Sequence, residues 1–168
     1  MGLRRFSDWV RQNKCIILAA ILLLVIFLVR CKFQLAYVPS ASMEKTIMTG
    51  EYVIIKRTDS IETGDIVAFY SEENAENMVK RCIGCPGDVV DVREGSVYLN
   101  GVFLTEEYVS SHTYETETFI VPEDAYLFMG DNRANSMDAR SWKNPYIEKE
   151  DVFGKVICKV YPTIKKFN

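Results

Sequence analysis

The feature that most constrains this chain is an apolar run near its N-terminus. The segment from Cys15 to Val29, CIILAAILLLVIFLV, holds fifteen residues without a charged or strongly polar side chain. A membrane-spanning helix needs about 20 apolar residues. Further apolar or aromatic residues lengthen the run on both sides: Trp9, Val10, Phe33, Leu35 and Tyr37. We therefore predict one transmembrane anchor helix over residues 15–35.

A cleaved secretory signal peptide is the competing interpretation, because the apolar region of such a peptide typically runs 7–15 residues. Two features favour an uncleaved anchor. Arg30 and Lys32 follow the run directly, and no good Ala-x-Ala-like cleavage site comes after it. Long basic side chains at the end of a span can extend to the membrane interface.

The distribution of charge predicts the orientation of the anchor. Residues 1–32 carry a net charge of +5, and residues 33–168 carry −8. Basic residues are more numerous before the run (Arg4, Arg5, Arg11, Lys14) than after it (Arg30, Lys32). The positive-inside rule then places residues 1–14 in the cytoplasm and residues 36–168 outside it. An acidic domain is poorly suited to phosphate contacts, which excludes nucleic acid as a partner.

After residue 36 the sequence changes to short runs rich in β-branched and aromatic residues, which predict strands. These runs are 52–56, 65–70, 78–82, 89–93, 96–99, 102–104, 126–129 and 152–160. Glu94-Gly95 and Asn100-Gly101 supply hairpin turns between them. The pattern predicts a mainly β domain, an antiparallel sheet or barrel, over residues 36–168. We expect the polar stretch 105–125 to be a small surface excursion or a small subdomain, and nothing in it suggests catalysis.

Two of the five cysteines, Cys82 and Cys85, form a C-x-x-C motif. A zinc site needs four ligands, and beyond the anchor the chain offers only Cys158 and His112 in addition. The sequence therefore predicts no metal site. Two interpretations of the pair stay open: small apolar core side chains, or a disulfide that closes a tight turn.

Three polar clusters interrupt the predicted strands, over residues 39–47, 80–88 and 130–140. Loops at the ends of buried strands commonly carry function. A Ser-His-Asp triad is disfavoured because His112, the only histidine, lies in a polar, weakly structured stretch. A lysine can act as the base instead, if burial lowers its pKa by about 2–3 units. Lys80 is the candidate, because its neighbours are apolar: Met78, Val79, Cys82 and Ile83.

Four motifs carry a family resemblance: Pro39-Ser-x-Ser-Met43, Gly64-Asp-Ile-Val67, Lys80-Arg-x-x-Gly-x-Pro-Gly-Asp88 and Gly130-Asp-Asn-Arg-x-Asn-Ser-x-Asp-x-Arg140. In order and spacing, behind a single N-terminal anchor, they resemble the signature motifs of bacterial type I signal peptidases of the short Gram-positive type. The resemblance implies a membrane-bound serine endopeptidase that removes signal peptides from exported preproteins after Ala-x-Ala-like sites. It implies no metal or organic cofactor, and it suggests the lipid bilayer and the secretion translocase as further partners.

The resemblance also implies roles for individual residues. Ser42 would be the nucleophile, Lys80 the general base, and Ser136 the hydroxyl that orients the Lys80 amine. Ser40 and the backbone N–H of Ser42 would form the oxyanion hole. Structural support is implied for Asp131, Arg133, Asp138 and Arg140. Substrate-binding positions are implied at Val38, Met43, Ile47, Met78 and Val79, with the peptide held extended by strand addition.

The sequence departs from the family pattern at three positions, none of them catalytic: Lys45 stands where proline is usual, Ala139 where serine is common, and Cys85 where an aliphatic residue is usual. Lys45 removes a rigid φ angle and adds a charge near the substrate pocket. It favours one alternative, a signal peptidase specialised for one class of substrate. A non-catalytic, membrane-tethered peptide-binding domain is a second alternative, although it would not require Ser42 with Lys80. A self-cleaving repressor would need a DNA-binding motif that residues 1–32 cannot supply.

Overall fold

The computed structural model describes residues 11–111 and 113–167. The predictions that rest on residues 1–10 and on His112 lie outside the described residues. The chain divides into two compact units, one up to Gln34 and the other from Leu35 onward.

Helix α2, Lys14–Lys32, contains the predicted apolar run. It has a mean hydropathy of 2.7, none of its residues is buried, and its length and composition suit a membrane span. At 1.5 Å per residue, 19 residues extend about 28 Å, close to the thickness of the hydrocarbon layer. The helix ends at Lys32 rather than at the predicted residue 35, because Phe33 adopts an extended backbone and begins a strand.

The larger sheet contains eight strands in the order β1-β2-β11-β3-β4-β9-β10, with β12 also paired to β11. Their bounds are β1 Phe33–Tyr37, β2 Tyr52–Lys56, β3 Ile66–Ser71, β4 Glu76–Gly84, β9 Ala125–Met129, β10 Tyr146–Glu148, β11 Val152–Tyr161 and β12 Lys165–Lys166. Strand β11 joins the two halves of this sheet, because it pairs antiparallel with both β2 and β3. Strand β4 lies between β3 and β9.

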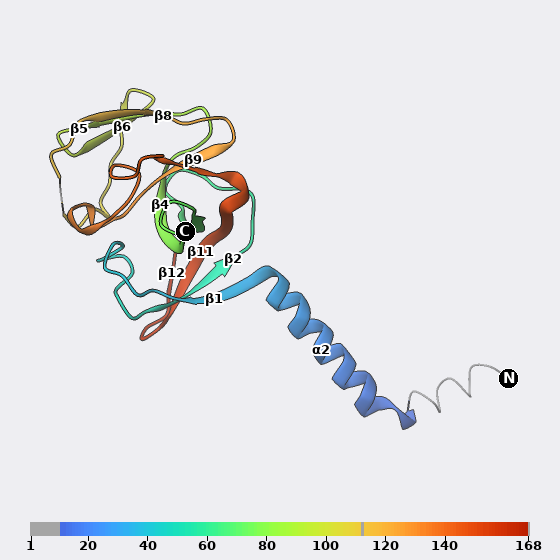
Figure 1. The fold of residues 1–168 in the computed structure, drawn as a ribbon. Coiled ribbons are helices and arrows are strands. Elements are labelled where there is room, and N and C mark those ends of the chain that lie inside the picture. The colour runs from blue at the N-terminus through green and yellow to red at the C-terminus, as the bar shows by residue number, and fades with distance from the viewer. Residues whose placement is uncertain (1–10, 112, 168) are drawn as a thin grey trace. The chain divides into compact units, whose positions relative to one another are not determined.

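The smaller sheet has the order β7-β6-β5-β8. Its strands are β5 Val89–Arg93, β6 Ser96–Leu99, β7 Val102–Phe103 and β8 Glu117–Ile120. Figure 1 shows β5, β6 and β8 together at one end of the domain, away from β2 and β12. Short 3₁₀ helices, η1 Arg133–Asn135 and η2 Lys149–Asp151, follow β9 and β10.

The prediction of a mainly antiparallel β domain behind one apolar helix is confirmed. Both hairpin turns have the positive φ angles that their residues favour: 49° and 80° at Glu94-Gly95, and 51° and 81° at Asn100-Gly101. Every predicted strand overlaps an observed one, whereas β1, β8, β10 and β12 were not predicted. These four strands are short, with two to five residues each, so their alternation of polar and apolar residues is a weak signal.

Two hydrophobic clusters form the core. The larger cluster includes Phe69 and Phe128, whose rings stack with centroids 4.4 Å apart, and the side chains of β4, β5 and β9. The second cluster combines side chains of β2, β3 and β11 with Val38, Met43 and Ile47. The segment around Ser42 is therefore anchored by apolar side chains on both sides of the serine, which holds the following turns on the sheet.

Candidate active site

The segment that carries Ser42 is fastened to the segment that follows β9. The Asn132 backbone N–H donates to the Ser42 carbonyl oxygen at 3.0 Å, and the Asn132 side-chain amide donates to the Ala41 carbonyl oxygen at 3.1 Å. Thr46 also donates a hydrogen bond to the Asp131 carboxylate. The first and third sequence clusters thus meet, although about 90 residues separate them in the chain.

Lys80 lies in the middle of β4 and is only 3% exposed. Its Nζ donates a hydrogen bond of 3.0 Å to Ser136 Oγ. Burial lowers the pKa of the Lys80 amine to about 8, although Asp138 and Glu76 oppose this shift. A base with a pKa near neutrality can accept a proton at physiological pH, as an ordinary lysine cannot.

Ser42 is also buried, with 6% of its surface exposed. Its Oγ lies 3.3 Å from Ser40 Oγ, within hydrogen-bond distance. In the part of the chain that the structure describes, Lys80 donates to Ser136 and no hydrogen bond links it to Ser42. Catalytic hydrogen bonds are often long before substrate binds and shorten in the complex.

Gly130 allows Ser136 to lie close to the Ser42 segment. A Cβ atom at this position would lie 2.2 Å from Ser136 Oγ and 2.6 Å from the Ser42 carbonyl oxygen. Any side chain at residue 130 would therefore push apart the Ser42 segment and the Ser136 hydroxyl, which accepts the hydrogen bond of Lys80. Sequence reasoning placed Gly130 in a motif but assigned it no role.

The four predicted support residues make three ion pairs: Arg140 with Asp138, Asp131 with Arg81, and Arg133 with Glu106. Arg140 pairs with Asp138 through two hydrogen bonds of 2.9 Å, and Asp138 also accepts the Gly130 backbone N–H at 2.9 Å. Although burial opposes ionisation, these hydrogen bonds hold the pKa of the Asp138 carboxyl below its usual value. A negative charge thus lies near Lys80 and raises the pKa of its amine.

Asp131 pairs instead with Arg81, a residue to which sequence reasoning gave no role. Arg81 Nε donates to Asp131 Oδ1 at 2.8 Å, and Arg81 Nη2 donates to Oδ2 at 2.6 Å. Because Arg81 follows Lys80 in β4 and Asp131 also accepts from Thr46, this pair links the strand of Lys80 to the segment of Ser42. The Lys80-Arg81 dipeptide is part of a sequence motif, but the motif does not indicate the partner of Arg81, because that partner lies 50 residues away.

Residues 106–111 and 113–115, in the stretch expected to be a surface excursion, contact all three clusters. Ser110 Oγ donates to the Glu44 carbonyl oxygen at 2.6 Å, and the Ser110 N–H donates to the Asp131 carbonyl oxygen at 3.0 Å. The Tyr108 ring lies 3.8 Å from the guanidinium carbon of Arg81. We call residues 106–111 and 113–115 the bracing segment, because they contact the segments of Ser42, Lys80 and Ser136.

Arg133 also pairs with the bracing segment. Arg133 Nη2 lies 2.5 Å from Glu106 Oε1, and the two side chains are 3% and 9% exposed. Further along the same stretch, Glu117–Ile120 forms strand β8, with Phe119 in the core. A mere surface excursion over 105–125 therefore differs from the structure, whereas the place of β8 in the smaller sheet agrees with the alternative of a small subdomain. Because this stretch is polar, nothing in its composition indicates that it contacts distant parts of the chain.

The predicted substrate-binding residues fall into two groups. Val38, Met43 and Ile47 are at most 3% exposed and pack in the second core cluster. Met78 and Val79, on β4 just before Lys80, are partly buried. Met78 and Val79 thus have exposed surface for contact with a peptide. Val38, Met43 and Ile47 instead pack in the core next to Ser42.

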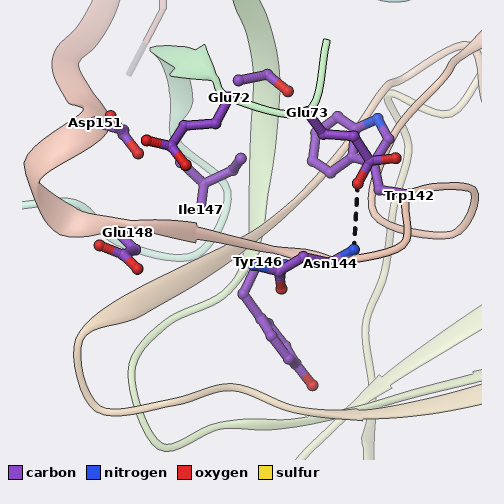
Figure 2. A pocket seen from close by; sticks show the side chains of 9 residues that line it. Glu72, Glu73, Trp142, Asn144, Tyr146, Ile147, Glu148 and Asp151 are labelled. Atoms are coloured by element: carbon purple, nitrogen blue, oxygen red, sulfur yellow. Dashed lines mark hydrogen bonds between the residues drawn. The ribbon is translucent and has the colours of Figure 1, made fainter. Parts of the chain in front are cut away.

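A separate pocket of about 340 Å³ lies elsewhere on the domain (Figure 2). Its lining is mostly acidic and aromatic: Ser71, Glu72, Glu73, Trp142, Asn144, Tyr146, Ile147, Glu148 and Asp151. Glu73 accepts the backbone N–H of Asn144 there, as the dashed line in Figure 2 shows. Because neither Ser42, Lys80 nor Ser136 contributes to its lining, this pocket is not part of the site around the buried lysine.

Comparison with known proteins places these observations in a family. Residues 8–161 match the family described as signal peptidase, peptidase S26. A probable signal peptidase I-2 of Synechocystis is 35% identical over 93% of this chain and 75% of the relative. Signal peptidase I P of Bacillus subtilis subsp. natto is 34% identical over 88% of this chain and 84% of the relative. The crystal structure of a signal peptidase I from Enterococcus faecalis has a TM-score of 0.52 and 31% identity, and the match covers 58% of this chain and 99% of that one.

Proposed function

Because the chain belongs to the signal peptidase family, peptidase S26, and is a peptidase that cleaves signal peptides, we propose that Ser42 and Lys80 perform the cleavage. The observation that carries this proposal is the buried Lys80 amine, with its lowered pKa and its hydrogen bond to Ser136 Oγ.

In the proposed mechanism, neutral Lys80 accepts the proton of Ser42 Oγ as this oxygen attacks the scissile carbonyl carbon. The resulting lysinium ion then gives a proton to the leaving amine, so that the peptide bond breaks and an ester to Ser42 remains. Lys80 next takes a proton from a water molecule, which attacks the ester, and returns this proton to Ser42 Oγ as the ester bond breaks and the signal peptide is released. The hydrogen bond from Lys80 Nζ to Ser136 Oγ positions the amine during both steps.

The oxyanion that forms on the scissile carbonyl needs hydrogen-bond donors. Ser40 Oγ lies 3.3 Å from Ser42 Oγ, and the Ser42 N–H belongs to the same segment, which supports their assignment as these donors. One such donor contributes about 3 kcal/mol to transition-state stabilisation in comparable enzymes. The Ser40 hydroxyl must then turn from Ser42 Oγ to the oxyanion as the reaction proceeds.

The register of β4 supports binding of an extended peptide beside Lys80. Strand β9 pairs with β4 only from Arg81 to Gly84, whereas β3 pairs with it from Glu76 to Arg81. Residues 76–80 of β4 therefore have one paired edge and one edge to which no described strand is paired. A substrate strand can add there through backbone hydrogen bonds, and Met78 and Val79 lie at that edge to contact the small side chains of an Ala-x-Ala-like site.

We propose that α2 anchors the enzyme in the lipid bilayer, with the N-terminus in the cytoplasm and the catalytic domain outside it. Ser42 lies only thirteen residues after Val29, the end of the apolar run. The active serine would then act near the outer face of the membrane, where the cleavage site of a signal peptide emerges from the translocase. Lys45, exposed on the nucleophile segment, favours a restricted class of substrates.

The proposal is tested with the full chain in detergent and a model preprotein that carries an Ala-x-Ala site. Wild type is compared with Ser42→Ala and Lys80→Ala, and product masses locate the cleaved bond. The matched controls are Ser60→Ala and Lys143→Ala, which remove exposed residues of the same types. Cleavage after the Ala-x-Ala site by wild type and both controls, but by neither of the other two variants, is the expected result. Cleavage at the wild-type rate by Ser42→Ala or Lys80→Ala would overturn the assignment.

A further inference from the structure

The Cys82-x-x-Cys85 pair takes no part in the mechanism above, yet the structure brings its two sulfur atoms within 3.9 Å. In a regular strand, residues three apart point to opposite faces. Here the register between β4 and β9 shifts by one residue between Cys82 and Gly84. This β-bulge turns Cys85 back to the side of the sheet to which Cys82 points, which is why the two thiols meet.

The two thiols have different surroundings. Cys82 is fully buried, at 0% exposed, whereas Cys85 is partly exposed at the start of the turn after β4. The hydrogen bond from Cys82 lowers the pKa of the Cys85 thiol to about 7, with help from Thr63 and against the effects of burial and Asp88. The pKa of Cys82 is raised by that same bond, by burial, and by the charges of Cys85, Asp65 and Asp88.

An accessible thiol that ionises easily beside a buried partner is the arrangement of an attacking and a resolving cysteine. We propose that Cys82 and Cys85 form a reversible dithiol–disulfide site at the end of β4, which exchanges with low-molecular-weight disulfides. The pair is not part of a metal site. Among residues 11–111 and 113–167, there is no group of three or more His, Cys, Asp or Glu side chains that could hold a metal ion.

The exchange proceeds in two steps. The Cys85 thiolate attacks one sulfur of the external disulfide, which forms a mixed disulfide on Cys85 and releases one thiolate. The Cys82 sulfur then attacks the Cys85 sulfur, and its proton passes to the second thiolate as that group leaves. The Cys82–Cys85 bond has formed, both cysteines are oxidised, and the external disulfide has been reduced to two thiols.

The local backbone can accommodate this bond. The sulfur atoms must close from 3.9 Å to about 2.05 Å. Cys82 is held by backbone hydrogen bonds of 2.8 Å to residues 64 and 65. Cys85 instead belongs to a turn closed by its own carbonyl and the Asp88 N–H at 3.0 Å, with Gly87 at φ 83°. The turn is therefore the part that moves, while β4 keeps its pairing.

The site is tested on the full chain in detergent, incubated with mixtures of reduced and oxidised glutathione. Free thiols are then blocked with N-ethylmaleimide, and the protein is digested with trypsin. Cleavage after Arg81 and Arg93 releases one peptide, residues 82–93, that contains both cysteines and no other. The expected product in oxidised glutathione is this peptide two hydrogens lighter and without maleimide, and dithiothreitol should restore the form with two maleimides.

Two variants separate the roles of the cysteines. Cys82→Ala should accumulate the glutathione adduct on Cys85, whereas Cys85→Ala should form no adduct on Cys82. Cys158→Ala removes a half-buried cysteine of β11 and should leave the disulfide in peptide 82–93 unchanged. A wild-type peptide that stays reduced, or that stops at the glutathione adduct, would overturn the proposal.

The rate of alkylation gives a second measurement that does not depend on bond formation. A thiol pKa of about 7 instead of 9.0 raises the thiolate fraction at pH 7 about 50-fold, and the weaker nucleophilicity of that thiolate leaves a gain of about fivefold. Cys85 should therefore be modified first under limiting N-ethylmaleimide, and Cys82→Ala should slow its modification. Equal rates at Cys82 and Cys85 would contradict the assigned asymmetry.

Discussion

Signal peptide cleavage by this protein should increase with pH as the buried Lys80 amine loses its proton. The pKa of Lys80 is lowered from 10.5 to about 8 by burial. At about 1.36 kcal/mol per pKa unit, this shift corresponds to about 3 kcal/mol of preference for the neutral amine. At pH 7 about one molecule in ten then carries neutral Lys80, whereas with an ordinary lysine it would be about one in 3,000.

The assay is kcat/KM for a peptide with an Ala-x-Ala site, measured from pH 6 to pH 10.5 in one detergent. We expect the rate to rise about tenfold per pH unit below pH 7, to reach half of its maximum near pH 8, and to level off above pH 9. A rate that keeps rising to pH 10.5, or one that is flat from pH 6, would refute a buried lysine base.

Glu76 supplies a sharper form of this test. Its exposed carboxylate raises the pKa of Lys80, so Glu76→Gln should move the midpoint of the pH profile to lower pH. Glu72→Gln removes another exposed acid, outside the charges that shift the pKa of Lys80 (Asp138, Glu76 and Arg140), and should leave the midpoint in place. Equal shifts in both variants would indicate a general effect of net charge rather than a local one on the base.

Three further predictions concern the groups that position the dyad. Ser136→Ala removes the acceptor of the Lys80 amine and should lower kcat about 10- to 100-fold with little change in KM; an unchanged kcat in steady-state kinetics would show that this hydroxyl does not orient the base. Gly130→Ala would place a methyl group 2.2 Å from Ser136 Oγ, so we expect a lower kcat and a lower melting temperature, and full activity would contradict the close approach. Glu106→Gln leaves a buried arginine without its ion-pair partner and should destabilise the domain by about 3–5 kcal/mol in denaturant unfolding. The matched variant Glu115→Gln, at a side chain that is 52% exposed, should cost about 1 kcal/mol or less.

The sequence allowed the chemistry to be predicted because the decisive residues lie in short local patterns. Lys80 is flanked in sequence by apolar residues, and it is buried in the structure. The hairpins at Glu94-Gly95 and Asn100-Gly101 follow from residues that tolerate positive φ. Each of these features depends on neighbours within a few positions, so composition and periodicity are sufficient to predict it.

The remaining features depend on partners that are distant in the chain. Helix α2 ends at Lys32 because the next residues join the sheet as β1. Arg81 meets Asp131, and the bracing segment meets the segment of Ser42, across separations of 50 and 66 residues. Such contacts cannot be recognised from neighbouring residues, because in the sequence a polar residue that pairs in the fold cannot be told from one that faces solvent.

The sequence by itself thus determined the apolar helix and most of the strands, and it supplied the residue types of the proposed dyad. Only the tertiary structure decided which charges pair, how Gly130 lets Ser136 approach the Ser42 segment, and that one bulge in β4 brings Cys82 to Cys85. The physical reason is that strand register decides which residues, far apart in the sequence, lie next to each other in the sheet. A shift of one residue reverses the face to which every following side chain points, and no local pattern encodes that shift.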